Sequence, residues 1–84
     1  MEGILFSSLS IRAFEKIDRR DFVPDTELSF AYENIPLPIG YGQTISAPSV
    51  VAFMIELLHV HEGDIVLDLG SGSGWTTALL AEVV

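Results

Sequence analysis

An acidic residue and a run of alternating glycines are the residues of this chain best suited to chemistry. They lie in the stretch DIVLDLGSGSGWTT, from Asp64 to Thr77. Its apolar beginning, Ile65–Leu69, predicts a short strand buried on both faces. Glycines at positions 70, 72 and 74 would let the backbone turn tightly and approach a ligand, because no Cβ stands in the way. From Trp75 the residues suit a helix, whose free N–H groups would point back into the turn. Together these features predict a cradle for a nucleotide-type cofactor.

The spacing of the glycines distinguishes between cofactors. A dinucleotide-binding turn follows the pattern G-x-G-x-x-G, but Trp75 occupies the position of its third glycine. The order here is acid-x-Gly-x-Gly-x-Gly, from Asp68 to Gly74, which resembles the first motif of class I S-adenosylmethionine (SAM) methyltransferases. This order suits SAM, because SAM has no phosphate for the helix N-terminus and an acidic side chain can face its cationic methionine part. The alternative is a turn that binds nothing, although such a turn needs only one glycine.

A second stretch resembles one particular family of these enzymes. The sequence PLPIGYGQTISAP, from Pro36 to Pro48, is similar to the signature of protein-L-isoaspartate O-methyltransferases. Arg20–Pro24 and Tyr32 are similar to the residues that precede this signature. Val51–Met54 and Leu57–Leu58 are similar to the helix that follows it. The resemblance covers roughly residues 10–84. The block G-x-G-Q-T-I-S is not shared by SAM enzymes at large, so the substrate assignment depends on it. A different class I SAM methyltransferase is a less favoured alternative.

The resemblance implies both a reaction and a set of site residues. The family transfers a methyl group from SAM to the α-carboxylate of an isoaspartyl residue in damaged protein, which begins its repair. A carboxylate is already ionised at pH 7, so the site has to align the reactants, exclude water and hold the carboxylate. The resemblance places Ser46 at the active-site position, where its hydroxyl at a helix N-terminus would hold an anion; alternatively, Ser46 only caps that helix. The implied cofactor-binding residues are Thr44, Ile45, Ser46, Ala47, Pro48, Asp68, Gly70, Ser71, Gly72, Ser73 and Gly74.

The implied fold class is α/β, the N-terminal part of a class I SAM-dependent methyltransferase with a Rossmann-like, doubly wound sheet, truncated after its first βα unit. Residues 1–48 would form a family-specific helix and the substrate and SAM loop, and residues 49–84 the incomplete start of the SAM-binding domain. The acid that holds the ribose, about 20 residues after the glycine turn, would fall beyond Val84. A lone strand would leave both of its edges unpaired. We therefore expect the chain alone to be inactive and to pair with the remainder of the domain or with itself. A non-catalytic remnant or pairing module is the alternative function.

The preceding residues predict one helix and a long irregular region. Residues 8–17 suit a helix with Ser7 or Ser8 as its N-cap. Its apolar face would consist of Leu9, Ala13, Phe14 and Ile17. Residues 25–34 fit either a short strand or an extended loop, and residues 35–42 predict an ordered but irregular loop.

A second helix is predicted after the signature. Ser46 suits its N-cap and Pro48 its first turn, and Gly63 is the expected terminator. Its apolar stripe, expected to face a core, consists of Val50, Val51, Met54, Leu57 and Leu58. Near the end of this helix lie three possible metal ligands, His59, His61 and Glu62. However, cations are favourable at a helix C-terminus in any case, and a catalytic zinc site usually has three well-placed ligands. No metal site is predicted.

Charge and composition exclude several classes of protein. The net charge is −8, and all four basic residues lie between Arg12 and Arg20, so nucleic acid is not expected as a partner. That basic window also contains Glu15 and Asp18, which predicts a mixed, solvated helix face. The chain has no cysteine, and no apolar run approaches the roughly 18 residues of a membrane span. Met1-Glu2 lacks the basic start of a secretory signal, so a cytoplasmic location is expected.

Overall fold

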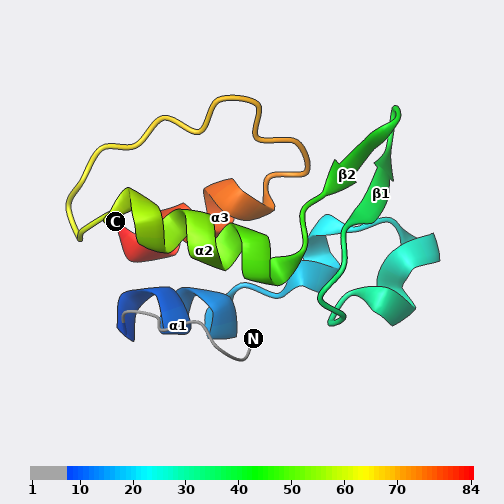
Figure 1. Cartoon of the computed structure of the whole chain (residues 1–84), viewed down its shortest axis with the longest axis horizontal. Helices are drawn as coiled ribbons and strands as arrows, with labels where there is room; N and C mark the ends of the chain where they lie inside the picture. Colours follow the sequence, from blue (N-terminus) through cyan, green and yellow to red (C-terminus); the bar gives the residue numbers. More distant parts are fainter. Residues whose placement is uncertain (1–7) are drawn as a thin grey trace.

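Three α-helices gather around one cluster of buried side chains, and a β-hairpin extends from one side of them (Figure 1). The computed structural model describes residues 8–84. The α-helices are α1 (Ser8–Lys16), α2 (Pro48–Leu58) and α3 (Trp75–Val83). Two 3₁₀-helices, η1 (Arg19–Phe22) and η2 (Asp25–Phe30), lead to the hairpin strands β1 (Leu37–Gly40) and β2 (Gln43–Ile45).

Helix α1 agrees closely with its prediction. Ala13 is buried, and the other three residues of the predicted face are partly buried against the core: Leu9, Phe14 and Ile17. The helix ends at Lys16, although the Ile17 N–H still donates to the Ala13 carbonyl at 2.9 Å. Ser8 is the first helical residue, whereas the other candidate cap, Ser7, lies outside the described residues.

Two 3₁₀-helices, η1 and η2, follow α1. Asp18 caps η1, because its carboxylate accepts from the Arg20 N–H at 2.9 Å. Tyr32 donates to the same carboxylate at 3.0 Å. The 3₁₀-helix η2 then spans Asp25–Phe30, so neither prediction for residues 25–34 is correct. The alternation of apolar residues did not reveal this helix, because side chains of a 3₁₀-helix repeat every third residue and not every second.

The predicted irregular loop is in fact a β-hairpin. Strands β1 and β2 are antiparallel, with Leu37 opposite Ile45 and an irregularity between Pro38 and Gly40. The turn takes positive φ values at three successive residues, 97° at Gly40, 58° at Tyr41 and 70° at Gly42. Glycine adopts such angles without steric cost, and the glycines on both sides of Tyr41 allow the chain to reverse here. The loop prediction was wrong because prolines argue only against central strands, and this sheet consists of two edges.

Helix α2 begins and ends at residues other than the predicted ones. Its N-cap is Ala47, with Pro48 in the first turn and no side-chain bond from the cap. The capping oxygen comes from a distant residue, because Asn34 Oδ1 accepts from the Ser49 N–H at 2.9 Å. The helix ends at Leu58, where His59 takes a left-handed φ of 53°. The predictions of Ser46 as N-cap and of Gly63 as terminator are therefore wrong.

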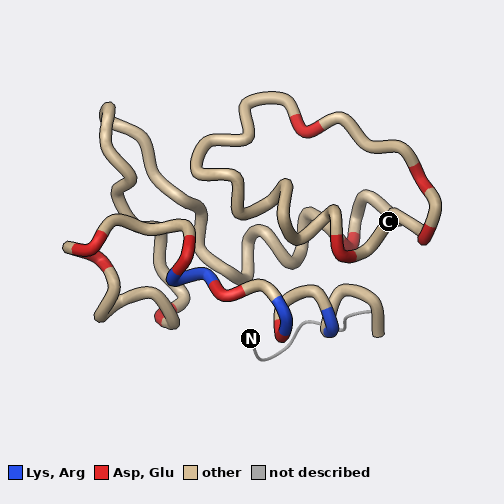
Figure 2. The backbone as a smooth tube through the Cα atoms, turned by 180° about the vertical axis from the view of Figure 1, so that it is seen from behind, with Lys and Arg blue, Asp and Glu red and all other residues tan. Residues whose placement is uncertain are grey.

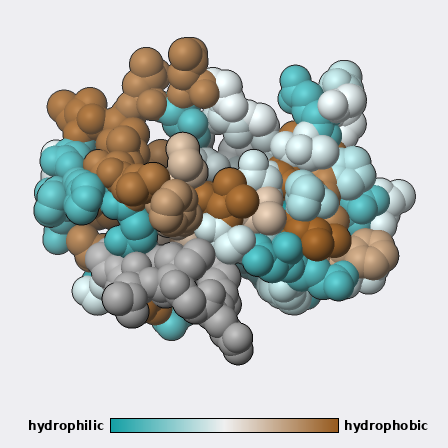
Figure 3. Space-filling model, in the orientation of Figure 1, coloured by the Kyte–Doolittle hydropathy of each residue, from teal (hydrophilic) through white to brown (hydrophobic). Residues whose placement is uncertain are grey.

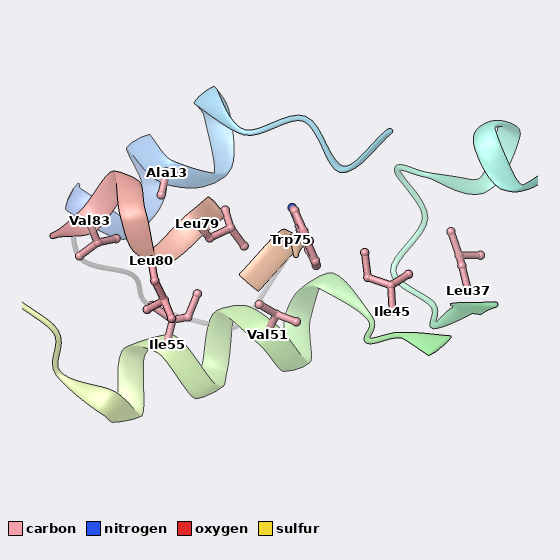
Figure 4. Close-up of a cluster of buried hydrophobic side chains, with 9 residues drawn as sticks. All are labelled: Ala13, Leu37, Ile45, Val51, Ile55, Trp75, Leu79, Leu80 and Val83. Atoms are coloured by element: carbon pink, nitrogen blue, oxygen red, sulfur yellow. The ribbon is translucent and has the colours of Figure 1, made fainter. Parts of the chain in front are cut away.

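The buried face of α2 is not the predicted apolar stripe. The residues of α2 that enter the core are Val51, Ala52 and Ile55, and Figure 4 shows Val51 and Ile55 pointing toward Leu79, Leu80 and Trp75 of α3. Of the predicted stripe, only Val51 is buried. The others are exposed by more than half of their surface: Val50, Met54, Leu57 and Leu58. The prediction failed because apolar residues surround most of this helix, so periodicity alone could not choose the face that meets α1 and α3.

The predicted strand before the glycines is an extended segment without a partner. Residues 60–74 pass over α2 as a long arc (yellow to orange in Figure 1). Val66 packs against the core, but Ile65, Leu67 and Leu69 expose 101%, 84% and 89% of their surface. Within residues 8–84 the hairpin is the only sheet, so no strand lies beside this segment to form a ladder. The strand prediction is therefore not met, and no parallel, doubly wound sheet is present in the described residues.

Candidate functional site

The glycine turn has the backbone conformation that its sequence requires. Gly70, Gly72 and Gly74 have φ values of 72°, 57° and 91°, which side chains other than glycine rarely adopt. The Gly74 N–H donates to the Ser71 carbonyl at 3.0 Å, and the Gly74 carbonyl accepts from Ala78 at 2.9 Å. Helix α3 thus begins directly from the turn, as predicted.

The glycine turn lies beside the hairpin. A Cβ placed on Gly72 would be 3.8 Å from Ile39 Cδ1 of β1, and in Figure 1 the end of the arc descends next to β2. Ser46, a residue of the signature, lies between the end of this hairpin and the start of α2. The fold thus brings together the two motifs that the sequence places about 25 residues apart.

Asp68 is held by a residue that the sequence analysis did not identify. Thr77 Oγ1 of α3 donates to Asp68 Oδ2 at 2.6 Å, which orients the carboxylate at the entrance of the turn. Figure 2 shows acidic residues along the arc, whereas Lys and Arg are confined to α1 and the residues just after it. The sequence contains no Lys or Arg from Asp21 onward. The surroundings of the turn therefore favour a cationic ligand over an anionic one.

Ser46 stands at the junction of β2 and α2. Ser46 is exposed to solvent. It directly precedes Ala47, the N-cap of α2, and Pro48, the first residue of that helix. Thr44 is exposed as well, whereas the Ile45 side chain is buried in the core with 5% of its surface exposed. Ile45 can therefore offer only its main chain to a cofactor. The hydroxyl of Ser46 lies near the helix N-terminus without capping it, so it is available to a ligand.

Arg19 is the most heavily bonded side chain near this junction. Its Nη1 donates to the carbonyls of Ala31 and Glu33 at 3.0 and 3.1 Å. Its Nη2 donates to the carbonyls of Ile35 and Ser46 at 2.8 and 3.1 Å. Only 4% of the residue is exposed, which contradicts the prediction that the basic window is a solvated face. Burial lowers the pKa of Arg19, because a low dielectric disfavours the charged form.

Nothing in the sequence separates Arg19 from Arg20, since both lie within D-R-R-D. Arg20 is exposed. The difference arises because the chain returns through residues 31–35 and 46, which present their carbonyls to Arg19 alone.

Trp75, the first residue of α3, packs against the same arginine. The Arg19 Cζ atom lies 5.3 Å from the centre of the Trp75 ring, within the range of a cation–π interaction. Phe14 meets the ring edge-on at 5.7 Å. A cavity of about 300 Å³ adjoins these residues. It includes Pro48, but its lining contains none of the other predicted cofactor-binding residues.

Sequence comparisons identify the family of the chain. The profile of one family, protein-L-isoaspartate (D-aspartate) O-methyltransferase, matches residues 1–84. The chain belongs to this family. Membership confirms the resemblance seen in the signature and the glycine motif, and the family is one of class I SAM methyltransferases.

Several curated members of the isoaspartate methyltransferase family resemble the chain closely. The protein-L-isoaspartate O-methyltransferase of Petrotoga mobilis is 51% identical over 74 residues, which are 88% of this chain and 35% of that protein. The enzyme of the same name from Aeropyrum pernix is 50% identical over 82 residues, 98% of this chain and 32% of the relative. That of Methanothermobacter thermautotrophicus is 45% identical over 82 residues. The chain spans about a third of the length of these relatives.

Residues 8–84 contain no group of three or more His, Cys, Asp or Glu side chains arranged to hold a metal ion. No helix within the same range is both long and apolar enough to cross a bilayer.

Proposed function

We propose that this chain supplies the carboxylate-holding loop and the SAM turn of a protein-L-isoaspartate O-methyltransferase. The observation that carries the proposal is the approach of Gly72 to Ile39, because it sets the glycine turn beside the hairpin that leads into Ser46. In the proposed reaction the methyl–sulfur bond of SAM breaks and a bond forms from the methyl carbon to an oxygen of the isoaspartyl α-carboxylate. The sulfur keeps the electron pair, and no proton has to move.

The described residues fit SAM as the cofactor. The glycine turn offers main chain without Cβ atoms, and Asp68 provides an oriented negative charge beside it. When bound, SAM supplies an activated methyl group. The proposed roles of the chain are to hold the cationic part of SAM with Asp68 and residues 70–74, and to contact it through residues 44–48.

Ser46 is proposed to hold the substrate carboxylate by donating its hydroxyl hydrogen. Its exposure and its place just before the α2 N-terminus support this role, because a helix N-terminus stabilises a nearby anion. The hydroxyl is not needed as a base, since the carboxylate is ionised at neutral pH.

We propose that residues 1–48 form the family-specific N-terminal helix with the substrate and SAM loop, and that residues 49–84 begin the SAM-binding domain. Residues 65–69 would be the first strand of a doubly wound, Rossmann-like sheet. The other strands would come from the remainder of the methyltransferase domain, and isoaspartyl proteins would be the substrates. The exposed apolar side chains of this segment support the proposal, because a pairing strand would cover them.

A hybrid protein tests the proposed function. Residues 1–84 of this chain replace the matching third of the Petrotoga mobilis relative, and methyl transfer from SAM is measured with an isoaspartyl peptide and with the same peptide containing aspartate. We expect transfer to the isoaspartyl peptide alone. A hybrid that folds and binds SAM but methylates neither peptide would contradict the proposed function and favour a pairing module.

Ser46→Ala tests the role of the hydroxyl in this hybrid. Loss of one charge-assisted hydrogen bond costs about 1.5–3 kcal/mol, so we expect kcat/KM for the peptide to fall by about 10- to 100-fold. The Kd for SAM should change by less than about twofold. Ser49→Ala, three residues further along in α2, is the matched control and should retain wild-type kinetics. Wild-type turnover in Ser46→Ala would leave this serine without a role in the reaction.

A further inference from the structure

We infer that Arg19 is a positioning residue that fixes Ser46 and the glycine turn relative to each other. This inference rests on the proposed function, because it assigns a role within the same site. Arg19 itself is buried and is not proposed to touch either substrate.

The hydrogen bonds of Arg19 determine where the Ser46 main chain lies. The four bonds use the four Nη hydrogens of the guanidinium. Two of the acceptors, the carbonyls of Ile35 and Ser46, lie just before β1 and just after β2. One planar group therefore ties both ends of the hairpin and sets the angle at which the chain enters α2.

The ring contact of Arg19 extends this arrangement to the cofactor turn. Trp75 follows Gly74 directly and is the first residue of α3. Only 2% of its surface is exposed, and the guanidinium lies 5.3 Å from the centre of its ring. A shift of Arg19 would therefore move the Ser46 carbonyl and release the beginning of α3 together.

Lysine cannot replace arginine in this arrangement. A lysine ammonium has three donors on a single nitrogen, whereas the four carbonyls lie around a planar fork with two terminal nitrogens. Arg19→Lys keeps the charge and much of the volume but loses the geometry. Arg20→Lys is the matched control, because Arg20 is the adjacent residue, of the same type, and exposed.

A double-mutant cycle in the hybrid separates positioning from general stability. Arg19→Lys is made with Ser46 intact and in the Ser46→Ala background, and kcat is measured at saturating SAM. If Arg19 acts through Ser46, its substitution lowers kcat about tenfold in the first protein and less than about twofold in the second, because interacting residues are not additive. Arg20→Lys should leave kcat unchanged in both. Equal effects of Arg19→Lys in the two backgrounds would overturn the inference.

Amide hydrogen exchange gives a readout that does not require methyl transfer. In the hybrid we expect Arg19→Lys to speed exchange at least tenfold at the hydrogen-bonded amides that begin α2 and α3, and Arg20→Lys to leave them unchanged. These amides are Val50 and Val51, which donate to the Ala47 carbonyl, and Ala78, which donates to the Gly74 carbonyl. Unchanged exchange in Arg19→Lys would overturn the inference even if the proposed function were correct. If the hybrid had no activity, this measurement would still decide the role of Arg19.

Trp75→Phe is a second test of the inference, to be used if Arg19→Lys fails to fold. It keeps an aromatic ring in the core but weakens the cation–π contact, because phenylalanine holds a cation less well than tryptophan. We expect a fall in kcat of about threefold with Ser46 intact and none with Ser46→Ala. A fall of the same size in both backgrounds would contradict the inference.

Discussion

At the scale of single residues, the candidate site combines groups whose conformation is set locally with groups that are held from a distance. The three glycines of the turn take left-handed angles within their own segment. Asp68, in contrast, is oriented by Thr77 from the next helix, and the Ser46 carbonyl by Arg19 from a much earlier segment. The side chain of Ser46 is left exposed, which is the arrangement expected of a group that holds a substrate.

Gly72→Val tests whether the left-handed backbone of the turn is needed for SAM. The added Cβ would meet Ile39 only at an ordinary contact distance, 3.8 Å, so the effect should come from φ and not from a clash. A left-handed conformation costs a residue with a Cβ about 1–2 kcal/mol, and a β-branched residue is a stronger outlier. We expect the Kd for SAM in the hybrid to rise at least about tenfold, measured by calorimetry.

Gly63→Val is the control for Gly72→Val. Gly63 also has a positive φ, 88°, and its Cβ would meet nothing within 4 Å. This substitution should lower stability but leave the Kd for SAM unchanged. Equal losses of affinity in the two variants would mean that the turn affects SAM only through stability.

At the scale of elements, helix α2 shows how the surroundings decide details that the helix sequence leaves open. Its N-terminus is completed by Asn34, from the segment before the hairpin. Its core-facing residues are those that meet α1 and α3, while a second apolar face points away from them. The helix is therefore apolar on two sides, which is typical of an element that packs between two layers.

Asn34→Ala tests the capping of α2 from outside the helix. Removal of the capping oxygen leaves the Ser49 N–H without its acceptor and should lower the free energy of unfolding by about 1 kcal/mol. The measurement is urea denaturation of the hybrid followed by circular dichroism. Asn34→Asp keeps an oxygen acceptor and places a negative charge at the helix N-terminus, so it should be at least as stable as the wild type. An Asn34→Ala protein of unchanged stability would show that solvent replaces the cap.

At the scale of the whole molecule, one face is strongly apolar. This apolar face consists of side chains of α2 and of the arc: Val50, Phe53, Met54, Leu57, Leu58, Ile65, Leu67 and Leu69. Figure 3 shows a brown region over the arc and α2. Soluble monomers rarely expose a contiguous patch of this kind, which usually marks an interaction surface. Residues 65–69 of the arc belong to no sheet within residues 8–84, so another strand could pair with their main-chain N–H and C=O groups.

The 84-residue chain alone should therefore self-associate and bind SAM weakly or not at all. We expect sedimentation velocity at about 50 µM to detect oligomers, because burial of apolar surface contributes about 25 cal/mol per Å². Leu57→Lys combined with Ile65→Lys should shift the chain toward monomer. Thr26→Lys with Ser29→Lys adds the same charge at exposed positions of η2 and should not. A wild-type monomer with micromolar affinity for SAM would contradict this expectation.

The sequence by itself determined the features that depend on neighbouring residues and on motif identity. The sequence alone predicted the glycine turn, the helices α1 and α3, and the family. Glycine backbone angles, local periodicity and a distinctive signature can be recognised without knowing which distant residues they contact. Only the tertiary structure decided the burial of Arg19, the hairpin before Ser46 and the face of α2 that enters the core. Each of these depends on which segments meet in space. Arg19 and Arg20 are equivalent along the chain, and they differ only because carbonyls from residues 31–46 converge on one of them.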